Sequence, residues 1–473
     1  MNRDIRSIAL VSREYPPFFG GGIGTYARWI VPALTRAGVR VHVITEAHDK
    51  THPRCSRDGL VTVHRVPMAV GRGGWTTAAA RFSIAAGRKA EELFRHGAID
   101  VCEFAECEAA GAALTMMRDA GGAARVPTLV HLHTPSEQLF VLRSLTPKAV
   151  DANLAFYFTA ERMALRLADR VCAPSRFIAD FAHAHYGLSE RPAVIPYAAA
   201  PLPRVEPGKP NAREQAVFYA GRIEPRKGVE PLIEAWHTIH AQHPGATLRL
   251  AGADTGGAPD GGSMKAYLRE RLGPASGSVS FLGKLPADAL AREYARCAVS
   301  VIPSLWENFP NVCIESMAHG CAVLVSDRGG MGEMIEGTTA GERFRAGDAN
   351  DLASKLAAML AEDHARLVAR GSTARDRIAW LCDPQRVAAE RRDLYREVAD
   401  SQTTANASPP APAHRAGAIT GDWRTLEAAL SGDLSGLGLP APEPAVERWV
   451  VQRDPTVQPR QTERNGATQC AAS

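Results

Sequence analysis

The sequence predicts an α/β protein in which two doubly wound, mostly parallel sheets follow one another along the chain. Short apolar segments alternate with helical patterns over residues 7–195, as expected for strands buried beneath helices. The same alternation restarts at residue 216, after a proline-rich segment. A chain of 473 residues is long enough for two or three domains. We therefore expect two Rossmann-like domains that face one another across a cleft, with ligands near the carboxyl ends of the strands.

The first half begins with clear strand and helix signals. Residues 7–12 (SIALVS) form a largely apolar segment, which is typical of a buried parallel strand. A helical pattern covers residues 24–37 and stops before Gly38, a residue type that favours helix C-termini. Further strands are expected at residues 39–45, 60–66, 101–103, 128–133, 170–173 and 193–195.

The second half begins after residues 201–212 (PLPRVEPGKPNA), whose four prolines indicate an interdomain boundary. We place one domain at residues 1–205 and a second at residues 206–383. A further helix is expected at residues 384–400, where charges are dense and helical spacing returns. Strands of the second domain are expected at residues 216–223, 246–252, 279–284, 299–304 and 321–327.

The C-terminal tail differs from the rest of the chain. Residues 401–473 begin with a segment rich in alanine, proline and serine, which predicts disorder. A short helix could form at residues 423–429, but the tail holds little that could build a core.

Composition limits the classes of function. The net charge of +4 is small for this length and gives no reason to expect a nucleic-acid partner. The nine cysteines include no CxxC pair, so a reducing cytoplasm is the simplest location. No apolar segment is long enough to span a membrane. Peripheral contact with the inner face of a membrane stays open, because an amphipathic helix needs no such segment.

A glycine-rich loop, FFGGGIGTYA at residues 18–27, includes Gly21, Gly22 and Gly24. It fits the G-x-G-x-x-A dinucleotide pattern, and Glu46 stands where an acidic ribose partner would be expected. However, residues 13–19 separate the strand from the glycines, whereas a dinucleotide loop follows its strand at once. We therefore interpret the loop as facing another ligand at a helix N-terminus.

The segment WENFPNVCIE at residues 306–315 places Glu307 and Glu315 eight positions apart. It lies between an expected strand and a helix that should start near Pro310, a favoured first helical position. Glu307 would then lie just outside the helix N-terminus, and Glu315 would lie within the helix and face the same cleft. Unpaired backbone N–H groups at residues 308–312 could point toward a ligand.

This segment resembles the E-x7-E element of retaining glycosyltransferases with the two-domain GT-B fold, specifically those of family 4. The resemblance covers roughly residues 8–395 and leaves the tail outside. Other segments that resemble family motifs, in order, are FFGGGIGTYA (18–27), HLHTP (131–135), APSRFIA (173–179), GRIEPRKG (221–228), LAGAD (250–254), VSFLGKLP (279–286) and DRGGMGEMI (327–335).

The resemblance implies transfer of a sugar from a nucleoside diphosphate to an unidentified acceptor, which could be a glycan, a lipid-linked sugar or a small molecule. It implies an acceptor side in the first domain, a donor side in the second, and a last helix that returns to the first. No cofactor is expected. No DxD motif stands where it could hold a divalent ion under the diphosphate, so we expect no metal, with Arg222 and Lys227 in that role.

The resemblance also implies roles for single residues. Arg222 and Lys227 would neutralise the donor diphosphate, while Glu315 would accept hydrogen bonds from the ribose. Glu307 and His133 would contact the donor sugar. The glycines would face the donor and the incoming acceptor, and Glu106 is a weaker candidate for the acceptor site. Residues expected to influence which sugar is accepted are Asn308, Phe309, Pro310 and Asn311.

Arg226, between the two expected diphosphate ligands, is interpreted as a surface residue.

Three other functions could use parts of these motifs. Two carboxylates could serve a retaining hydrolase, but the family uses the pair mainly to bind the donor. A catalytically idle homologue that only binds a nucleotide sugar is the first alternative, and the intact charged motifs argue against it. An NAD-dependent oxidoreductase built on the first sheet is the second.

Overall fold

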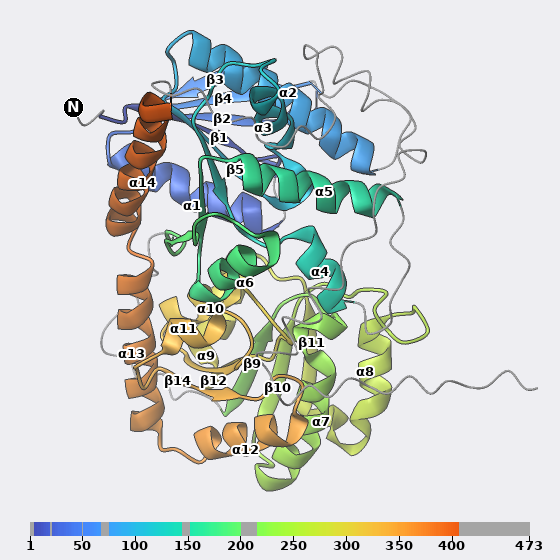
Figure 1. Ribbon diagram of the computed structural model, residues 1–473. Coiled ribbons are helices and arrows are strands. Elements are labelled where there is room, and N and C mark those ends of the chain that lie inside the picture. The colour runs from blue at the N-terminus through green and yellow to red at the C-terminus, as the bar shows by residue number, and fades with distance from the viewer. Residues whose placement is uncertain are drawn as a thin grey trace, which may run out of the picture.

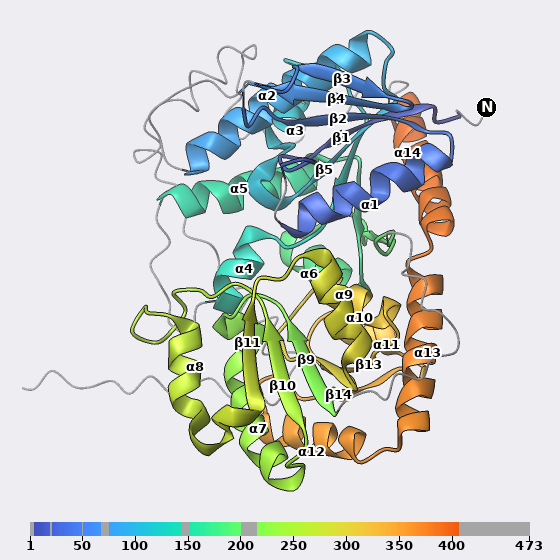
Figure 2. The same ribbon diagram turned by 180° about the vertical axis from the view of Figure 1, so that it is seen from behind.

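The computed structural model describes residues 4–18, 21–49, 51–67, 75–143, 152–199 and 215–405. Two α/β units lie one above the other, and each is built around its own sheet (Figures 1 and 2). The expected boundary at residues 201–212 lies outside the described residues, as does the tail beyond residue 405 with its considered helix at 423–429.

The first sheet has eight strands in the order β3-β4-β2-β1-β5-β6-β7-β8, and only β3 is antiparallel to its neighbour. The central strand β1 pairs with β2 on one side and β5 on the other, so the strand order reverses at β1. The strands are β1 (Ser7–Val11), β2 (Arg40–Glu46), β3 (Cys55–Asp58), β4 (Val61–Val66), β5 (Val101–Ala105), β6 (Thr128–His131), β7 (Arg170–Ala173) and β8 (Ala193–Val194).

The second sheet has six parallel strands in the order β11-β10-β9-β12-β13-β14. Its order reverses between β9 and β12, which pair directly. The strands are β9 (Ala216–Ala220), β10 (Thr247–Ala251), β11 (Val279–Gly283), β12 (Val299–Ile302), β13 (Ala322–Ser326) and β14 (Gly341–Phe344). The predicted architecture of two doubly wound sheets is confirmed.

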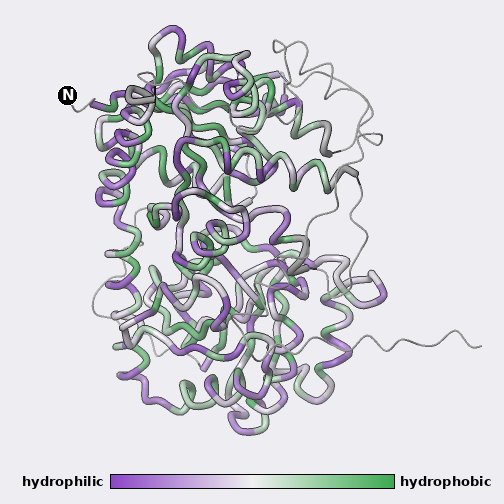
Figure 3. The backbone as a smooth tube through the Cα atoms, in the orientation of Figure 1, coloured by the Kyte–Doolittle hydropathy of each residue, from purple (hydrophilic) through white to green (hydrophobic). Residues whose placement is uncertain are grey.

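Helices cover both sheets, and the hydrophobic segments lie in the interior of each unit (Figure 3). The described α-helices are α1 (Gly22–Arg36), α2 (Trp75–Arg95), α3 (Ala112–Asp119), α4 (Ser136–Arg143), α5 (Ala152–Leu167), α6 (Arg176–Tyr186), α7 (Val229–Gln242), α8 (Met264–Leu272), α9 (Ala287–Arg296), α10 (Asn311–Ala318), α11 (Met331–Ile335), α12 (Ala349–Leu360), α13 (His364–Leu381) and α14 (Pro384–Ala405). Short 3₁₀ turns are η1 (Cys107–Ala109), η2 (Pro225–Lys227) and η3 (Gly273–Ser278).

Local sequence explains where several helices start. Ser263, Asp348 and Asp363 precede α8, α12 and α13, and each side chain accepts a hydrogen bond from the backbone N–H three residues later. Such caps satisfy a donor that would otherwise lack a partner in the first turn. In contrast, Gly21 precedes α1 without a side-chain cap, and its own N–H donates to the Glu14 carboxylate at 2.9 Å.

The last two helices run along one side of both units (Figure 1). Helix α13 packs against the second unit, and α14 packs against α1 and β5–β6 of the first. Helix α14 continues to Ala405, beyond the expected end at residue 400.

A buried polar cluster attaches α14 to the first unit. Arg391 is fully buried, donates to the hydroxyl of Tyr26 at 2.6 Å and to the sulfur of Cys172 at 2.8 Å. Its guanidinium lies 3.5 Å from the carboxylate of Glu103, which also accepts a 2.5 Å hydrogen bond from Tyr395. These contacts link the last helix to the first helix and to the centre of the sheet.

Replacing Arg391 should weaken the fold. Arg391→Met would leave Glu103 buried without its cation, and breaking such a pair typically costs about 3–5 kcal/mol. Urea unfolding should show this loss. Arg392→Met is the matched control. This neighbouring side chain is 33% exposed, and it makes a long ion pair of 4.0 Å with Asp4 and a 3.3 Å hydrogen bond to the Ala37 carbonyl oxygen. Equal and small effects of the two substitutions would contradict a stabilising role for the cluster.

Candidate functional site

The carboxyl ends of the two sheets meet at Asn308, in the loop between β12 and α10. Its side-chain N–H₂ donates to the His133 carbonyl oxygen at 2.8 Å and to the Gln138 side-chain oxygen at 3.0 Å, both in the first unit. Asn308 is only 2% exposed. In this conformation Asn308 therefore connects the two units, and its amide nitrogen is occupied by protein acceptors.

Helix α6 gives a second connection. The Glu333 carboxylate, from the second unit, accepts hydrogen bonds from the backbone N–H groups of Arg176 at 2.9 Å and Phe177 at 2.8 Å. These N–H groups lie in the first turn of α6, so a residue from the other unit caps this helix. Ser175, which precedes the helix, donates instead to the Asn308 carbonyl oxygen at 2.9 Å. The two units are thus connected at two points, through Asn308 and through Glu333.

Aromatic rings surround His133 just beyond the end of β6. The Tyr26 ring lies 4.9 Å from the imidazole, and the Tyr197 hydroxyl lies 2.8 Å from its Nδ1. Phe309, from the second unit, packs edge-on against Tyr197 at 5.4 Å. Burial, followed by the positive charge of Arg391, lowers the pKa of His133 to about 3. The imidazole is therefore neutral at physiological pH.

His131, two residues earlier, lies deeper, as strand periodicity predicts. It is 1% exposed, and neither ring nitrogen has a hydrogen-bond partner among the described residues. Burial is the main cause that lowers its pKa far below the usual range.

Glu106 does not occupy an open acceptor site, contrary to the sequence-based expectation. It is fully buried, and both carboxylate oxygens lie 2.8 Å from the backbone nitrogen of His133. Burial raises its pKa to about 7, against the opposing effect of the His133 N–H and other backbone donors. Glu106 therefore supports the backbone that carries His133. This supporting role could not be predicted from the sequence, because a glutamate in a sequence does not indicate whether its carboxylate is buried or faces a ligand.

Glu307 belongs to the second unit and lies beside the turn η2, which follows β9. Its Oε1 accepts hydrogen bonds from Lys227, from Arg226 at 3.1 Å and from Ser304 at 3.2 Å. Burial opposes ionisation, but the charges of Lys227 and Arg226 outweigh it and lower the pKa of Glu307. An ionised carboxylate is thus held between two cations.

Arg226 is not a surface residue, and that expectation was wrong. Its side chain is 10% exposed and lies over the Trp306 ring, with 5.2 Å between the guanidinium carbon and the ring centroid. Arg222 is the exposed arginine, with 52% of its side chain accessible and a 3.1 Å ion pair to Glu224. Arginine often stacks on tryptophan, but nothing in the sequence places Trp306 against an arginine 80 residues away.

Two glycines permit close packing around Glu307. A Cβ on Gly228 would lie 1.8 Å from the Pro303 carbonyl oxygen, and one on Gly329 would lie 1.9 Å from that of Glu307. Both also have positive φ angles, +67° and +92°, which side chains disfavour. These glycines therefore fix the backbone on either side of Glu307.

The glycine loop of the first unit reaches the same region. Gly21 and Gly22 are exposed, whereas Gly24 is buried in α1. The Gly21 N–H donates to Glu14 at 2.9 Å. A Cβ on Gly22 would lie 3.9 Å from the side-chain nitrogen of Asn311, the first residue of α10.

Glu315 lies on α10, which begins directly after Pro310. The Tyr294 hydroxyl lies 3.5 Å from its carboxylate. Burial raises the pKa of Glu315 to about 7. Glu307 lies in the loop before α10 and Glu315 lies within α10. Their pKa values are nevertheless shifted in opposite directions, because only Glu307 faces two cations.

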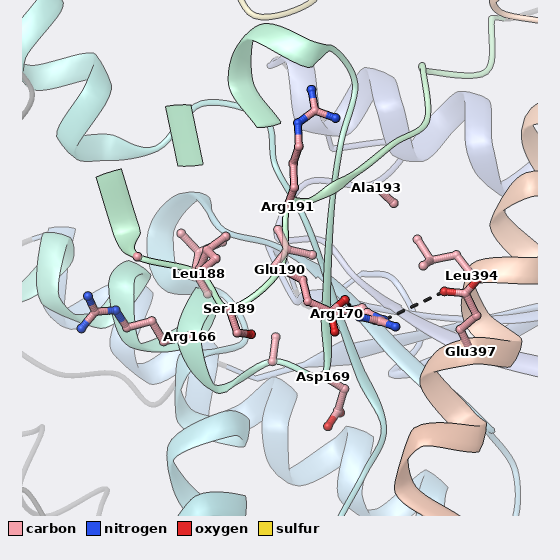
Figure 4. A pocket seen from close by; sticks show the side chains of 14 residues that line it. Arg166, Asp169, Arg170, Leu188, Ser189, Glu190, Arg191, Ala193, Leu394 and Glu397 are labelled. Carbon is pink, nitrogen blue, oxygen red and sulfur yellow. Dashed lines mark ion pairs between the residues drawn. The ribbon is translucent and has the colours of Figure 1, made fainter. Parts of the chain in front are cut away.

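A cavity of about 450 Å³ opens beside the glycine loop and is lined by Gly21, Gly22 and Glu46 among others. A second cavity, of about 510 Å³, lies between β7 and α14 and contains none of the predicted site residues. There Arg170 pairs with Glu190 and lies 4.0 Å from Glu397 (Figure 4).

Within the described ranges, no group of three or more His, Cys, Asp or Glu side chains is arranged to hold a metal ion. In the same ranges, no helix combines the length and the apolarity that crossing a membrane requires.

Two family models match the chain in succession. Residues 20–198 match the Glycosyltransferase Family 4 model, and residues 214–362 match the Glycosyl transferases group 1 model. The two matches correspond to the two units of the structure.

Two curated relatives, from different organisms, match over most of their length. Glycogen synthase of Mycobacterium tuberculosis is 25% identical over 82% of this chain and 94% of its own. Phosphatidyl-myo-inositol mannosyltransferase of Mycolicibacterium smegmatis is 26% identical over 76% of this chain and 87% of its own.

Solved structures share the architecture. Sucrose-phosphate synthase from Thermosynechococcus elongatus superposes with a TM-score of 0.66 at 24% identity, over 84% of this chain and all of the other. Anabaena HepE in complex with UDP-glucose gives a TM-score of 0.59 at 19% identity, over 84% of this chain and 99% of that protein. Together with the site described above, the family matches show that this chain belongs to the family 4 (group 1) glycosyltransferases and is a GT-B glycosyltransferase that uses a nucleotide-sugar donor.

Proposed function

We propose that the protein transfers a sugar with retention of configuration, without a metal ion or other cofactor, to an acceptor bound by the first unit. The observation that carries this proposal is the convergence of Lys227 and Arg226 on Glu307, opposite the buried His133. At the carboxyl ends of both sheets, the cations can bind the diphosphate of the donor, and the ionised carboxylate can accept hydrogen bonds from its sugar.

The charges of this cluster suit a donor diphosphate. Arg222, Arg226 and Lys227 pair with only two carboxylates, those of Glu224 and Glu307, so one positive charge remains in excess. Arg222, with 52% of its side chain exposed, can turn toward the phosphates. Lys227 and Arg222 would thus stabilise the negative charge that grows on the departing diphosphate, in the place of a divalent ion.

The transfer itself would proceed on one face of the donor sugar, as in the resembling family. The bond between the anomeric carbon and the phosphate oxygen breaks, and the nucleoside diphosphate leaves with the electron pair. The acceptor oxygen bonds to the same carbon from the same side and gives its proton to the departing phosphate. The neutral imidazole of His133 can hydrogen-bond to a sugar hydroxyl without adding charge.

Glu315 and its neighbours would hold the rest of the donor. The Glu315 carboxylate is the candidate acceptor for the ribose hydroxyls. Phe309 and Pro310 shape the loop before α10, while Asn311 and Gly22 bring the two units close. Asn308 is hydrogen-bonded across the interface, so its influence on sugar choice would act through the position of this loop.

The relatives leave the acceptor open, since one is named for a polymer, glycogen, and another for a lipid, phosphatidyl-myo-inositol. A lipid-linked acceptor would place the enzyme at the inner face of a membrane, in the synthesis of envelope polysaccharide, and a soluble acceptor would leave it in the cytoplasm.

A thermal-shift screen over UDP, GDP, ADP and dTDP sugars, followed by an assay of donor turnover, tests the proposed activity. A ligand that binds only the folded state must raise the melting temperature. We expect one nucleotide family to stabilise the protein and its sugar to be consumed. Stabilisation without turnover, with or without acceptors, would favour the idle homologue.

Lys227→Ala and Arg222→Ala should each lower kcat about a hundredfold, because loss of one charged donor to a developing anion typically costs about 3 kcal/mol. Donor binding should weaken as well. Arg292→Ala is the control, since that arginine is 67% exposed and pairs only within α9. Changes in KM alone, with kcat intact, would show that these cations do not act in the transition state.

Donor binding should strengthen as the pH rises from 6 to 8. With a pKa of about 7, Glu315 is mostly protonated at pH 6 and mostly ionised at pH 8, and the ionised form accepts hydrogen bonds from the ribose. The dissociation constant of the nucleotide sugar should fall about tenfold over this range. Glu315→Gln should bind more weakly at pH 8 and lose this slope. A slope that persists in Glu315→Gln would assign it to another group.

A further inference from the structure

The charge of the cavity beside the glycine loop affects which acceptor it can bind. We propose that it takes an uncharged polyol, such as the terminal unphosphorylated sugar or cyclitol of the acceptor, and that it discriminates against a phosphorylated one. This inference rests on the proposed function, because it assumes that the acceptor enters from the first unit.

The position of the cavity suits an acceptor. It lies at the carboxyl ends of β1, β2 and β5, where the strand order of the first sheet reverses, the preferred ligand position in such sheets. Gly21 and Gly22 form its border toward the second unit, and Gly22 approaches Asn311 there. A hydroxyl held in this cavity would thus be close to the proposed donor site. The volume of about 450 Å³ is in the range of small-molecule sites.

The described lining is acidic. It contains the carboxylates of Glu14, Glu46 and Glu108, and Arg13 is its one arginine or lysine within the described ranges. Arg13 donates to Glu46 at 2.6 Å and to Glu108 at 2.9 Å, so two of the carboxylates already balance its charge. His48 and Cys107 are the other titratable groups of the described lining. A ring nitrogen of His48 lies 3.1 Å from the Arg13 carbonyl oxygen, and burial raises the pKa of the Cys107 thiol.

The backbone at Glu108 is held in a disfavoured conformation. Glu108 and Ala109 have φ angles of 59° and 52°, a region that residues other than glycine rarely adopt. The Glu108 N–H donates at 3.0 Å to the buried carboxylate of Glu161, which fixes this turn. The surrounding structure therefore directs the Glu108 side chain toward Arg13 and the cavity. Residues held in such conformations cluster at functional sites.

Hydroxyl groups and phosphates interact differently with this acidic lining. Carboxylate oxygens only accept hydrogen bonds, and each sugar hydroxyl can donate one. A phosphate has no N–H or O–H donors to offer when ionised and would be repelled by the excess negative charge. Arg13 could bind it well only by releasing Glu46 and Glu108, which would then lack their cation.

Matched pairs of small molecules test the proposal at pH 8. The pairs are glucose with glucose 6-phosphate, fructose with fructose 6-phosphate, and myo-inositol with its 3-phosphate. Saturation-transfer NMR would measure binding to the full chain, alone and with the nucleotide that stabilises it most. We expect at least one neutral member to bind and its phosphorylated partner to bind at least tenfold more weakly.

Substitutions then connect this preference to the cavity. Glu46→Gln/Glu108→Gln keeps the shape but releases the charge of Arg13, so the preference should fall to threefold or less. Glu92→Gln, at an exposed pair on α2, is the control and should keep the preference. Far-ultraviolet circular dichroism would confirm folding, and the single variant Glu46→Gln should show an intermediate effect.

Tighter binding of any phosphorylated member than of its neutral partner would overturn the proposal. No binding of any neutral member would also overturn it, as would a preference that survives the double substitution. Failure of every nucleotide to stabilise the protein would instead count against the proposed donor site, so the two failures are distinguishable.

Discussion

The hydrogen bonds of Asn308 across the interface between the two units determine the geometry of the candidate site. Its side chain contacts the His133 carbonyl oxygen and Gln138, and its own carbonyl accepts from Ser175. The loop that contains Asn308 also carries Glu307 and leads into α10 with Glu315. Gly329 and Gly330 lie directly against the backbone of Glu307 and Asn308, so this loop is fixed from both sides. One buried amide thus connects residues of different sheets, next to the contact of Glu333 with α6.

Burial and neighbouring charges give similar side chains different states. Glu307 is ionised because two cations face it, whereas burial raises the pKa of Glu315 to about 7. Glu106, also with a pKa raised to about 7, holds the backbone of His133. The imidazole of His133 is kept neutral by burial and by Arg391, the residue that attaches α14. The last helix therefore supports the site indirectly, through the cluster around Tyr26.

The sequence predicted the two sheets well because their central strands are apolar runs bounded by helical patterns. It missed β3 (CSRD) and β14 (GERF), which are short and polar edge strands without a hydrophobic pattern. The motif residues Glu307 and Lys227 were identified through the resemblance of their segments to family 4 glycosyltransferase motifs, and they prove to be in contact. The functions of these residues remain proposals.

Contacts between distant segments could not be predicted from one sequence. The burial of Arg226 depends on Trp306, 80 residues away, and that of Glu106 depends on how β5 meets β6. Likewise, Glu333 was seen only as a motif member, although its carboxylate caps α6 of the other unit. Residue type and spacing do not specify such partners, which arise when the two units pack.

A crystal structure of the full chain with a bound nucleoside diphosphate sugar tests the central assignment most directly. We expect the diphosphate within hydrogen-bond distance of Arg222 and Lys227, the ribose at Glu315, and the sugar between Glu307 and His133. A diphosphate bound instead at the glycine loop of the first unit, away from Arg222 and Lys227, would contradict this assignment of the donor site.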